Sequence, residues 1–149
     1  MRRSALRRWR WQRVPYSACM SLNLQINGRA ITGIDSFYAE INRVFMADEE
    51  WALGPSLDAL DDLLYGGYGA LQGHATATVT WRDAELSRAV LGMDATRAWL
   101  QVKLQQPGTF NADVIRRQRD ALERGEGQTY FEIVMEVFAG HPRITLRLE

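Results

Sequence analysis

The sequence contains a single cysteine, Cys19, among its 149 residues, so an internal disulfide is impossible. Proteins without paired cysteines are typical of reducing compartments. The sequence also lacks any run of about 18 apolar residues, the length that a membrane-spanning helix needs. We therefore predict a cytoplasmic protein that has no disulfide and makes no membrane contact.

Motifs for cofactor binding or catalysis are equally scarce. Gly66, Gly67 and Gly69 follow an expected helix instead of joining a strand to a helix, so they are a weak signal for a phosphate-binding loop. His74 and His141 are isolated residues in turn-like contexts. We therefore predict no cofactor, no metal and no enzymatic activity.

The net charge of zero hides an uneven distribution of charge. Residues 1–20 contain six arginines and no acidic residue, which leaves twelve basic residues against all 18 acidic residues in the remainder of the chain. Between Asp35 and Asp62, eight acidic residues stand against one basic residue, Arg43. Such an uneven charge distribution affects which partners a protein attracts and how fast it associates with them, and it does not determine the fold.

The arginine-rich segment 1–20 lacks the apolar stretch of a signal peptide. A transit peptide and a nucleic-acid-binding arm are two alternatives for this segment. Met20 directly precedes a strand-like pattern, however, and we expect it to be the true start. We predict that residues 1–20 are a disordered extension or a start-site artefact, and that residues 21–149 form one domain.

The most informative stretch is residues 55–65, whose periodicity predicts a short amphipathic helix. Its leucines fall on one arc, and Asp58, Asp61 and Asp62 fall on the other. Aspartate in a helix interior costs roughly half a kcal/mol relative to alanine, and Asp58 and Asp62 repel each other as i,i+4 neighbours. The pattern indicates a negative face for a positive partner, and the alternative is an ordinary solvated face.

The rest of the chain alternates between strand and helix patterns. Period-two alternation predicts strands at 22–26, 75–81 and 144–149. Helical spacing predicts further helices at 36–46, 83–91, 94–105, 111–124 and 130–138. Helix-linked strands predict an α/β fold with a small, three-stranded, mainly parallel sheet that is covered by helices.

Several local features of these elements are also predicted. We expect Asn27-Gly28 to form a tight turn after which Ile31 continues the strand pairing. Asp35 or Ser36 is expected to cap the next helix, and Leu86 is expected to point inward. Residues 96–104 could form a strand instead of a helix.

The segment 53–64 resembles the barstar family of ribonuclease inhibitors through its Gly-x-x-Leu-Asp-Ala-Leu-x-Asp pattern, Gly54 to Asp62. The resemblance begins at Ile26-Asn27-Gly28, returns at Val79-Thr80-Trp81-Arg82, and continues in the last helix and the last strand. It covers most of residues 21–92 and 129–149. Residues 93–128 have no counterpart in short family members and are predicted to be a helical insertion before the last helix.

The resemblance implies an inhibitor whose second helix enters a ribonuclease active site, where Asp58 and Asp62 occupy the places of RNA phosphates. Loop residues before that helix would line the contact, and a glutamate of the last helix would contribute. Trp51 is out of register with the family's aromatic residues, and Asp61 replaces a tryptophan, so the cognate nuclease is not identified. The expected partner-binding residues are Trp51, Leu53, Gly54, Ser56, Asp58, Asp61, Asp62 and Glu136.

We thus predict that residues 21–149 form a monomeric, bacterial immunity protein that inhibits a small secreted or toxin-type ribonuclease with a basic active site. No direct nucleic-acid binding is expected from this domain. Two alternatives stay open. The same fold could dock on a non-nuclease partner through residues 93–128, or, less favourably, the aspartate cluster could bind Mg²⁺ in an enzyme.

Overall fold

Three parallel strands form the sheet of this α/β protein in the computed structural model, which describes residues 21–106 and 108–149. The strands β1 (Ser21–Asn27), β2 (Thr76–Arg82) and β3 (Ile144–Leu148) lie in the order β1-β2-β3. The predicted class and the three predicted strands are confirmed. The basic segment 1–20 and its expected start at Met20 lie outside the described residues.

The sheet buries one face of its central strand. Val79 pairs with Leu24 of β1 and with Leu146 of β3. Ala77, Val79 and Trp81 are buried, whereas the threonines between them are partly exposed. This alternation is the period of two that the sequence showed, because successive strand side chains point to opposite faces.

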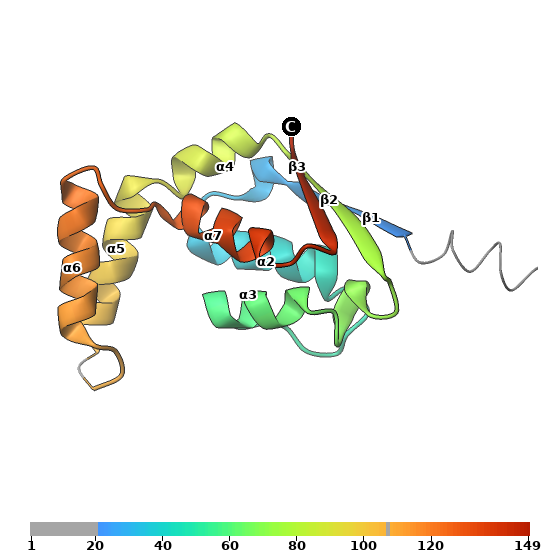
Figure 1. Cartoon of the computed structure of the whole chain (residues 1–149), viewed down its shortest axis with the longest axis horizontal. Coiled ribbons are helices and arrows are strands. Elements are labelled where there is room, and N and C mark those ends of the chain that lie inside the picture. The colour runs from blue at the N-terminus through green and yellow to red at the C-terminus, as the bar shows by residue number, and fades with distance from the viewer. Residues whose placement is uncertain (1–20, 107) are drawn as a thin grey trace, which may run out of the picture.

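Six α-helices accompany the sheet in the described part of the chain (Figure 1). Two single-turn 3-10 helices, η1 (Gly28–Ala30) and η2 (Gly69–Leu71), lie in the connections. The α-helices are α2 (Ile34–Phe45), α3 (Leu57–Leu64), α4 (Ala84–Val90), α5 (Met93–Leu104), α6 (Ala112–Glu123) and α7 (Tyr130–Ala139).

Trp81 joins the sheet to the helices that cover it. Its ring stacks on Phe37 of α2 at 5.7 Å between centroids and contacts Phe131 of α7 at 5.4 Å. Its indole N–H donates to the Ser87 hydroxyl at 2.9 Å, so its buried polar atom is satisfied. Helices α2 and α7 therefore pack on the same face of β2.

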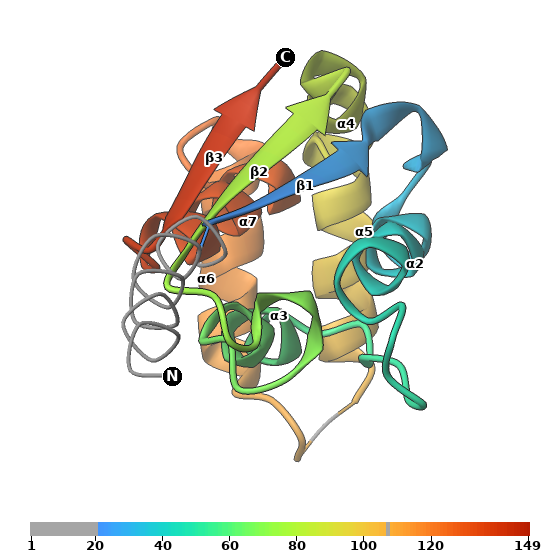
Figure 2. The ribbon, with the colours of Figure 1, turned by 90° about the vertical axis from the view of Figure 1, so that its right-hand side faces the viewer.

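Helices α5 and α6 form a hairpin at the end of the molecule away from the sheet (Figures 1 and 2). The hairpin has a small core of its own, made by Leu100, Ile115 and Leu122. The hydroxyl of Thr96 accepts the backbone N–H of Tyr130 at 2.7 Å, which attaches α5 to the start of α7. The helical prediction for 94–105 and 111–124 is confirmed, and the strand alternative for 96–104 is wrong.

Of two predicted details at the start of the chain, the turn at Asn27-Gly28 is confirmed and the continued strand pairing of Ile31 is wrong. The chain turns directly after β1 in η1, where the Asn27 side chain accepts the Arg29 N–H and the Gly28 carbonyl oxygen accepts the Ile31 N–H at 3.2 Å. No hairpin follows this turn, and Ile31 does not extend the strand. A parallel neighbour leaves no place for a hairpin at this point. Gly28 is required here because a Cβ would lie 2.3 Å from the carbonyl oxygen of Arg82.

The caps and faces of two helices also differ from expectation. Gly33 is the N-cap residue of α2, in place of the predicted Asp35 or Ser36. From the third helical position, the Ser36 hydroxyl accepts the N–H groups of Thr32 and Gly33 at 2.7 and 3.0 Å, as the N3 residue of a capping box does. Leu86 is exposed, because the short helix α4 turns Ala84 and Ser87 toward the core. A seven-residue helix has few inward positions, and the small residues Ala84 and Ser87 occupy them.

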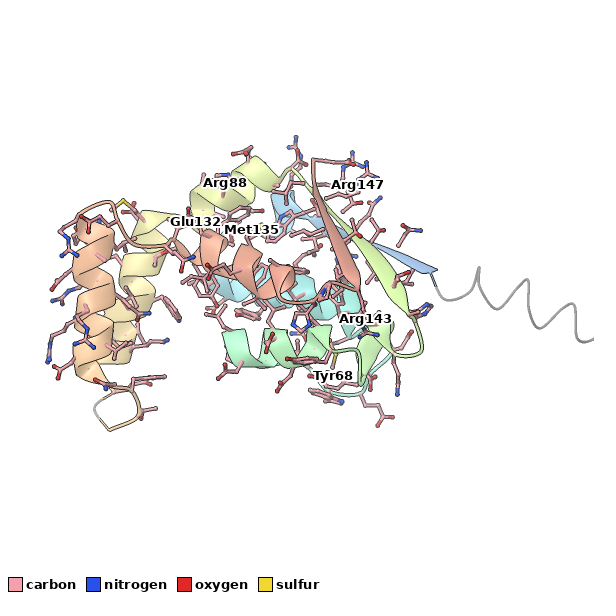
Figure 3. The ribbon with its side chains drawn as sticks, viewed as in Figure 1. Tyr68, Arg88, Glu132, Met135, Arg143 and Arg147 are labelled. Carbon is pink, nitrogen blue, oxygen red and sulfur yellow. The ribbon has the colours of Figure 1, made fainter. Side chains whose placement is uncertain are left out.

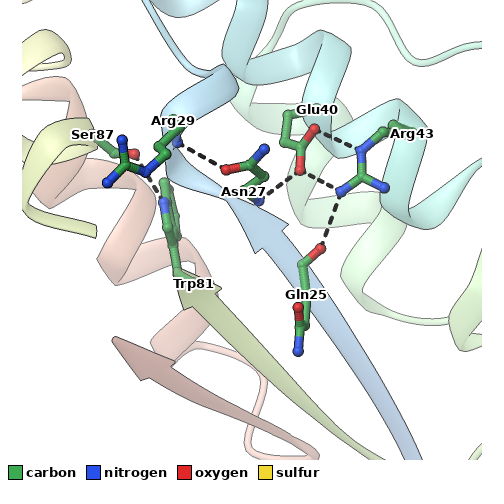
Figure 4. Close-up of polar contacts among 7 residues, drawn as sticks. All are labelled: Gln25, Asn27, Arg29, Glu40, Arg43, Trp81 and Ser87. Atoms are coloured by element: carbon green, nitrogen blue, oxygen red, sulfur yellow. Dashed lines mark hydrogen bonds and ion pairs between the residues drawn. The ribbon is translucent and has the colours of Figure 1, made fainter. Parts of the chain in front are cut away.

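Glu40 is a buried carboxylate that ties α2 to the end of β1 (Figure 4). It accepts the Asn27 backbone N–H at 2.7 Å and two N–H groups of Arg43 at 2.6 and 2.8 Å. Burial opposes ionisation of this carboxyl, but the hydrogen bonds from Arg43 and Asn27 outweigh it and lower the pKa of Glu40.

We predict that Glu40→Gln lowers the free energy of unfolding at pH 7 by about 1–3 kcal/mol, because a charge-assisted hydrogen-bond network is weakened. Because the pKa of Glu40 is lower in the folded state, its ionised carboxylate stabilises the fold fully at pH values above the ordinary glutamate pKa of about 4.3. This stabilisation is lost as the pH falls through the folded-state pKa of Glu40. Urea unfolding between pH 7 and pH 3 should therefore show that the difference in the free energy of unfolding between the wild type and Glu40→Gln becomes smaller as the pH falls. Glu85→Gln, which removes an exposed carboxylate paired with Arg88, is the control and should change little; a pH-independent difference for Glu40→Gln would contradict the prediction.

Candidate functional site

Helix α3 separates a buried leucine arc from an exposed acidic arc, as the sequence predicts. Leu60, Leu63 and Leu64 are at most 1% exposed, while Asp58 and Asp62 are exposed. The Ser56 hydroxyl caps the helix by accepting the Ala59 N–H at 3.0 Å. The leucines therefore fix which side of α3 faces solvent.

Asp61 is turned toward the connection between α7 and β3. Its carboxylate lies 2.7 Å from Nε2 of His141, a buried side chain. The ring of Tyr65 packs edge-on against the same histidine, with centroids 4.7 Å apart. Asp61 is therefore engaged within the chain, which leaves Asp58 and Asp62 as the exposed pair. Neither of these two makes an ion pair within residues 21–106 and 108–149.

Arg143 secures the other end of α3 (Figure 3). It donates to the carbonyl oxygen of Tyr65 at 2.6 Å and to that of His74 at 3.4 Å. The last carbonyls of a helix have no partner inside the helix, and a basic side chain can satisfy them. The acidic helix is thus anchored near both ends and along its buried arc.

The loop before α3 is attached to α2 by Asn42. The Asn42 amide accepts the Leu53 N–H at 2.7 Å and donates to the Leu53 carbonyl oxygen at 3.3 Å. Leu53 is buried, whereas the expected contact residues Gly54 and Ser56 are exposed. Reasoning from the sequence missed Asn42; its only signal is an asparagine in a helix interior, where this residue is unfavourable unless it has a partner.

An aromatic pair stands beside Asp62. Trp51 is 49% exposed and packs against Tyr68 with ring centroids 4.9 Å apart. Partial burial raises the pKa of the Tyr68 hydroxyl, and the negative charge of Asp62 raises it further. Glu49 accepts the Gly69 N–H at 2.8 Å, which joins the acidic loop to the segment after α3. The predicted contact residue Trp51 thus lies in the same region as Asp62.

A second aromatic group flanks Asp58 from the α5–α6 hairpin. The ammonium group of Lys103 lies 3.9 Å from the ring centroid of Trp99 and 5.0 Å from that of Phe110. Burial lowers the pKa of Lys103, and the charge of Asp58 opposes that shift. The insertion therefore reaches the N-terminal end of the acidic helix, which the sequence did not predict.

Glu136, the remaining expected contact residue, is exposed on α7. Helix α7 packs against α3. In the described part of the chain, no hydrogen bond or ion pair joins the Glu136 side chain to the aspartates of α3. The structure therefore brings together the loop, the acidic helix and the hairpin, and places Glu136 on the neighbouring helix.

The described residues offer no preformed metal site. No group of three or more His, Cys, Asp or Glu side chains there is arranged to hold a metal ion, and the three aspartates of α3 do not form one. Within the same residues, no helix combines the length and the apolar character needed to cross a membrane.

Comparisons with protein-family models and with curated proteins found no match to this chain.

We predict opposite effects on stability for two neighbouring aspartates. Asp62→Ala should raise the free energy of unfolding by about 0.5 kcal/mol, because alanine is the better helix former and the repulsion from Asp58 is removed. Asp61→Ala gains the same helix propensity but loses the contact with His141. It should therefore lower the free energy of unfolding by about 1 kcal/mol. Urea unfolding of both variants and of a double-mutant cycle with His141→Ala measures the contact. Equal effects of the two substitutions would contradict this role of Asp61.

Lys103 is the only lysine in the chain, so ¹³C-lysine labelling yields one side-chain signal whose titration can be followed by NMR. We predict a pKa below the ordinary lysine value of about 10.4. Asp58→Asn should lower that pKa further, because it removes a charge that favours the ammonium form. Asp94→Asn, which alters an exposed aspartate paired with Arg97 on the same helix, is the control. An unchanged or higher pKa in Asp58→Asn would show that the two groups do not interact.

Proposed function

We propose that this protein inhibits a ribonuclease by inserting the acidic face of α3 into the basic site that binds RNA phosphates. The observation that carries the proposal is the pair Asp58 and Asp62, two exposed carboxylates without ion-pair partners among the described residues. Carboxylates are acceptors for the lysine and arginine side chains that bind phosphate. The resemblance of residues 53–64 to the barstar family supports the same assignment.

The electrostatics of α3 favour rapid association with a basic partner. Three aspartates project from eight helical residues, and none of the residues Leu57–Leu64 is basic. Complementary potentials raise the rate of encounter and reject partners of like charge, and this effect weakens as salt increases. An acidic helix is therefore suited to capture an enzyme whose own site must attract a polyanion.

The anchoring of α3 favours slow release. Ser56, Asn42, Asp61 and Arg143 hold the helix and its preceding loop before any partner arrives. Rigid binding elements lose less conformational freedom on association, so more of the contact energy appears as affinity. Trp51 and Tyr68 beside Asp62 supply exposed aromatic area of the kind that is enriched at the energetically important positions of interfaces.

In biological terms, we propose an immunity role in which the chain blocks a small secreted or toxin-type ribonuclease within the cell that makes it. Such a role needs no catalytic residue and no cofactor. It needs a surface that a basic active site recognises and that stays folded before the partner binds.

The test is inhibition of a barnase-type ribonuclease by the wild-type chain and by Asp58→Asn and Asp62→Asn. These substitutions keep the side-chain shape and remove the charge. We expect each to raise the inhibition constant about thirtyfold or more, since truncating one partner of a desolvated charge pair costs at least about 2 kcal/mol. Increasing salt should slow the association of the wild-type chain.

Glu85→Gln is the matched control, because it neutralises an exposed carboxylate on α4, on the side of the molecule opposite α3 (Figures 1 and 2). It should leave the inhibition constant unchanged. Inhibition that is equally tight in Asp62→Asn and in the wild type would place the binding surface elsewhere. If the wild type inhibits none of a panel of small basic ribonucleases, the proposed function is wrong.

A further inference from the structure

A groove runs between the α5–α6 hairpin and the N-terminal ends of α2 and α3. Its volume is about 520 Å³, and a second hollow of about 320 Å³ continues along the same wall of α5. Ile34 and Leu57 contribute apolar surface from α2 and α3, while Trp99 and Val102 contribute it from α5. The groove is therefore formed jointly by the acidic helix and the inserted hairpin.

The groove combines aromatic walls with carboxylates. Asp35 and Asp58 lie on its α2 and α3 side, and Trp99 and Phe110 lie on its hairpin side. Val102 and Phe110 are large apolar side chains that are 52% and 38% exposed. Because Asp58 also belongs to the exposed face of α3, the groove is continuous with the surface that the proposed function assigns to the partner.

The groove already receives a positive charge from within the chain. Lys103, the only lysine of the sequence, places its ammonium group over the rings of Trp99 and Phe110. A cation over aromatic rings is attracted by their electron-rich faces, and nearby carboxylates add to that attraction. The intramolecular contact shows what kind of group these walls accept.

We infer that the groove receives an arginine side chain of the partner ribonuclease, and that Lys103 fills the place of this cation in the free protein. The inference rests on the proposed function and extends it, because it assigns the insertion 93–128 a direct contact with the partner. Docking moves the Lys103 ammonium group out toward solvent, and the guanidinium group takes its position between the rings and Asp58.

Three properties favour arginine over other occupants. A guanidinium group is planar and stacks on aromatic rings, it pairs with a carboxylate through two parallel hydrogen bonds, and it is more weakly hydrated than an ammonium group. An anionic group would be repelled by Asp35 and Asp58. A purely apolar side chain would cover these carboxylates without giving them a partner, which is unfavourable.

The first experiment observes Lys103 directly in the full-length, ¹³C-lysine-labelled chain. The probes are acetyl-Gly-Arg-Gly-amide and its citrulline counterpart, which has a similar shape but no charge. We expect the arginine peptide, at millimolar concentration, to move the Lys103 signal from its ring-shifted position toward that of a free lysine, and the citrulline peptide to leave it in place. No shift with the arginine peptide, or equal shifts with both peptides, would overturn the inference.

The second experiment removes parts of the groove without disturbing a core. Phe110→Ala truncates an exposed ring and should weaken binding of the arginine peptide, and inhibition of the ribonuclease, by between about threefold and thirtyfold. Val114→Ala truncates another exposed apolar side chain of the hairpin that does not line the groove, and should change neither. Equal effects of the two substitutions would overturn the inference.

Lys103→Met provides a change in the opposite direction. It keeps the apolar length of the side chain but removes the resident charge, so binding of the arginine peptide should tighten at least about threefold. Arg116→Met, which removes a positive charge from the hairpin outside the groove, controls for the general gain in negative potential. An equal gain in both variants would contradict a specific place for Lys103.

These experiments separate the inference from the proposed function. Ribonuclease inhibition that is unaffected by both Phe110→Ala and Lys103→Met would overturn the groove inference and leave the proposed function intact. A specific arginine-peptide shift in a chain that inhibits no ribonuclease would keep the cation site and reject the ribonuclease as its partner. A Lys103 signal that depends on protein concentration alone would assign the groove to a second copy of this chain and overturn the inference.

Discussion

The burial of one arc of α3 is the constraint on which the rest of the site depends. Leu60, Leu63 and Leu64 are covered by the core, and on a helix this burial forces the residues between them toward solvent. Two exposed carboxylates and a partly exposed third follow from that geometry. The apolar burial of three leucines, each worth roughly 1.5–3 kcal/mol, exceeds the small repulsion between i,i+4 aspartates.

Polar contacts from distant parts of the chain convert this short helix into a fixed element. Asn42 holds the loop before it, His141 binds Asp61, and Arg143 satisfies a carbonyl at its end. An isolated helix of eight residues is unstable in water. The position of the acidic face therefore depends on contacts from α2 and from the connection between α7 and β3.

The α5–α6 hairpin adds a second wall to this surface. It has a small core of its own and is joined to the main core through Thr96 and Trp99, which both contact Tyr130. Aromatic residues consequently flank α3 on both sides, with Trp51 and Tyr68 beside Asp62. A binding surface of this kind combines charge for encounter with apolar area for retention.

The sequence by itself determined the strands, nearly all helix positions and the two arcs of α3, because hydrophobic periodicity reports which face of an element is buried. It did not reveal that Asp61 meets His141, 80 residues away, or that Lys103 lies beside Asp58. It was also wrong about the strand pairing of Ile31 and about Leu86. Periodicity carries no information on which side chains meet across elements; only the packing of α3, α5 and α7 decided those contacts.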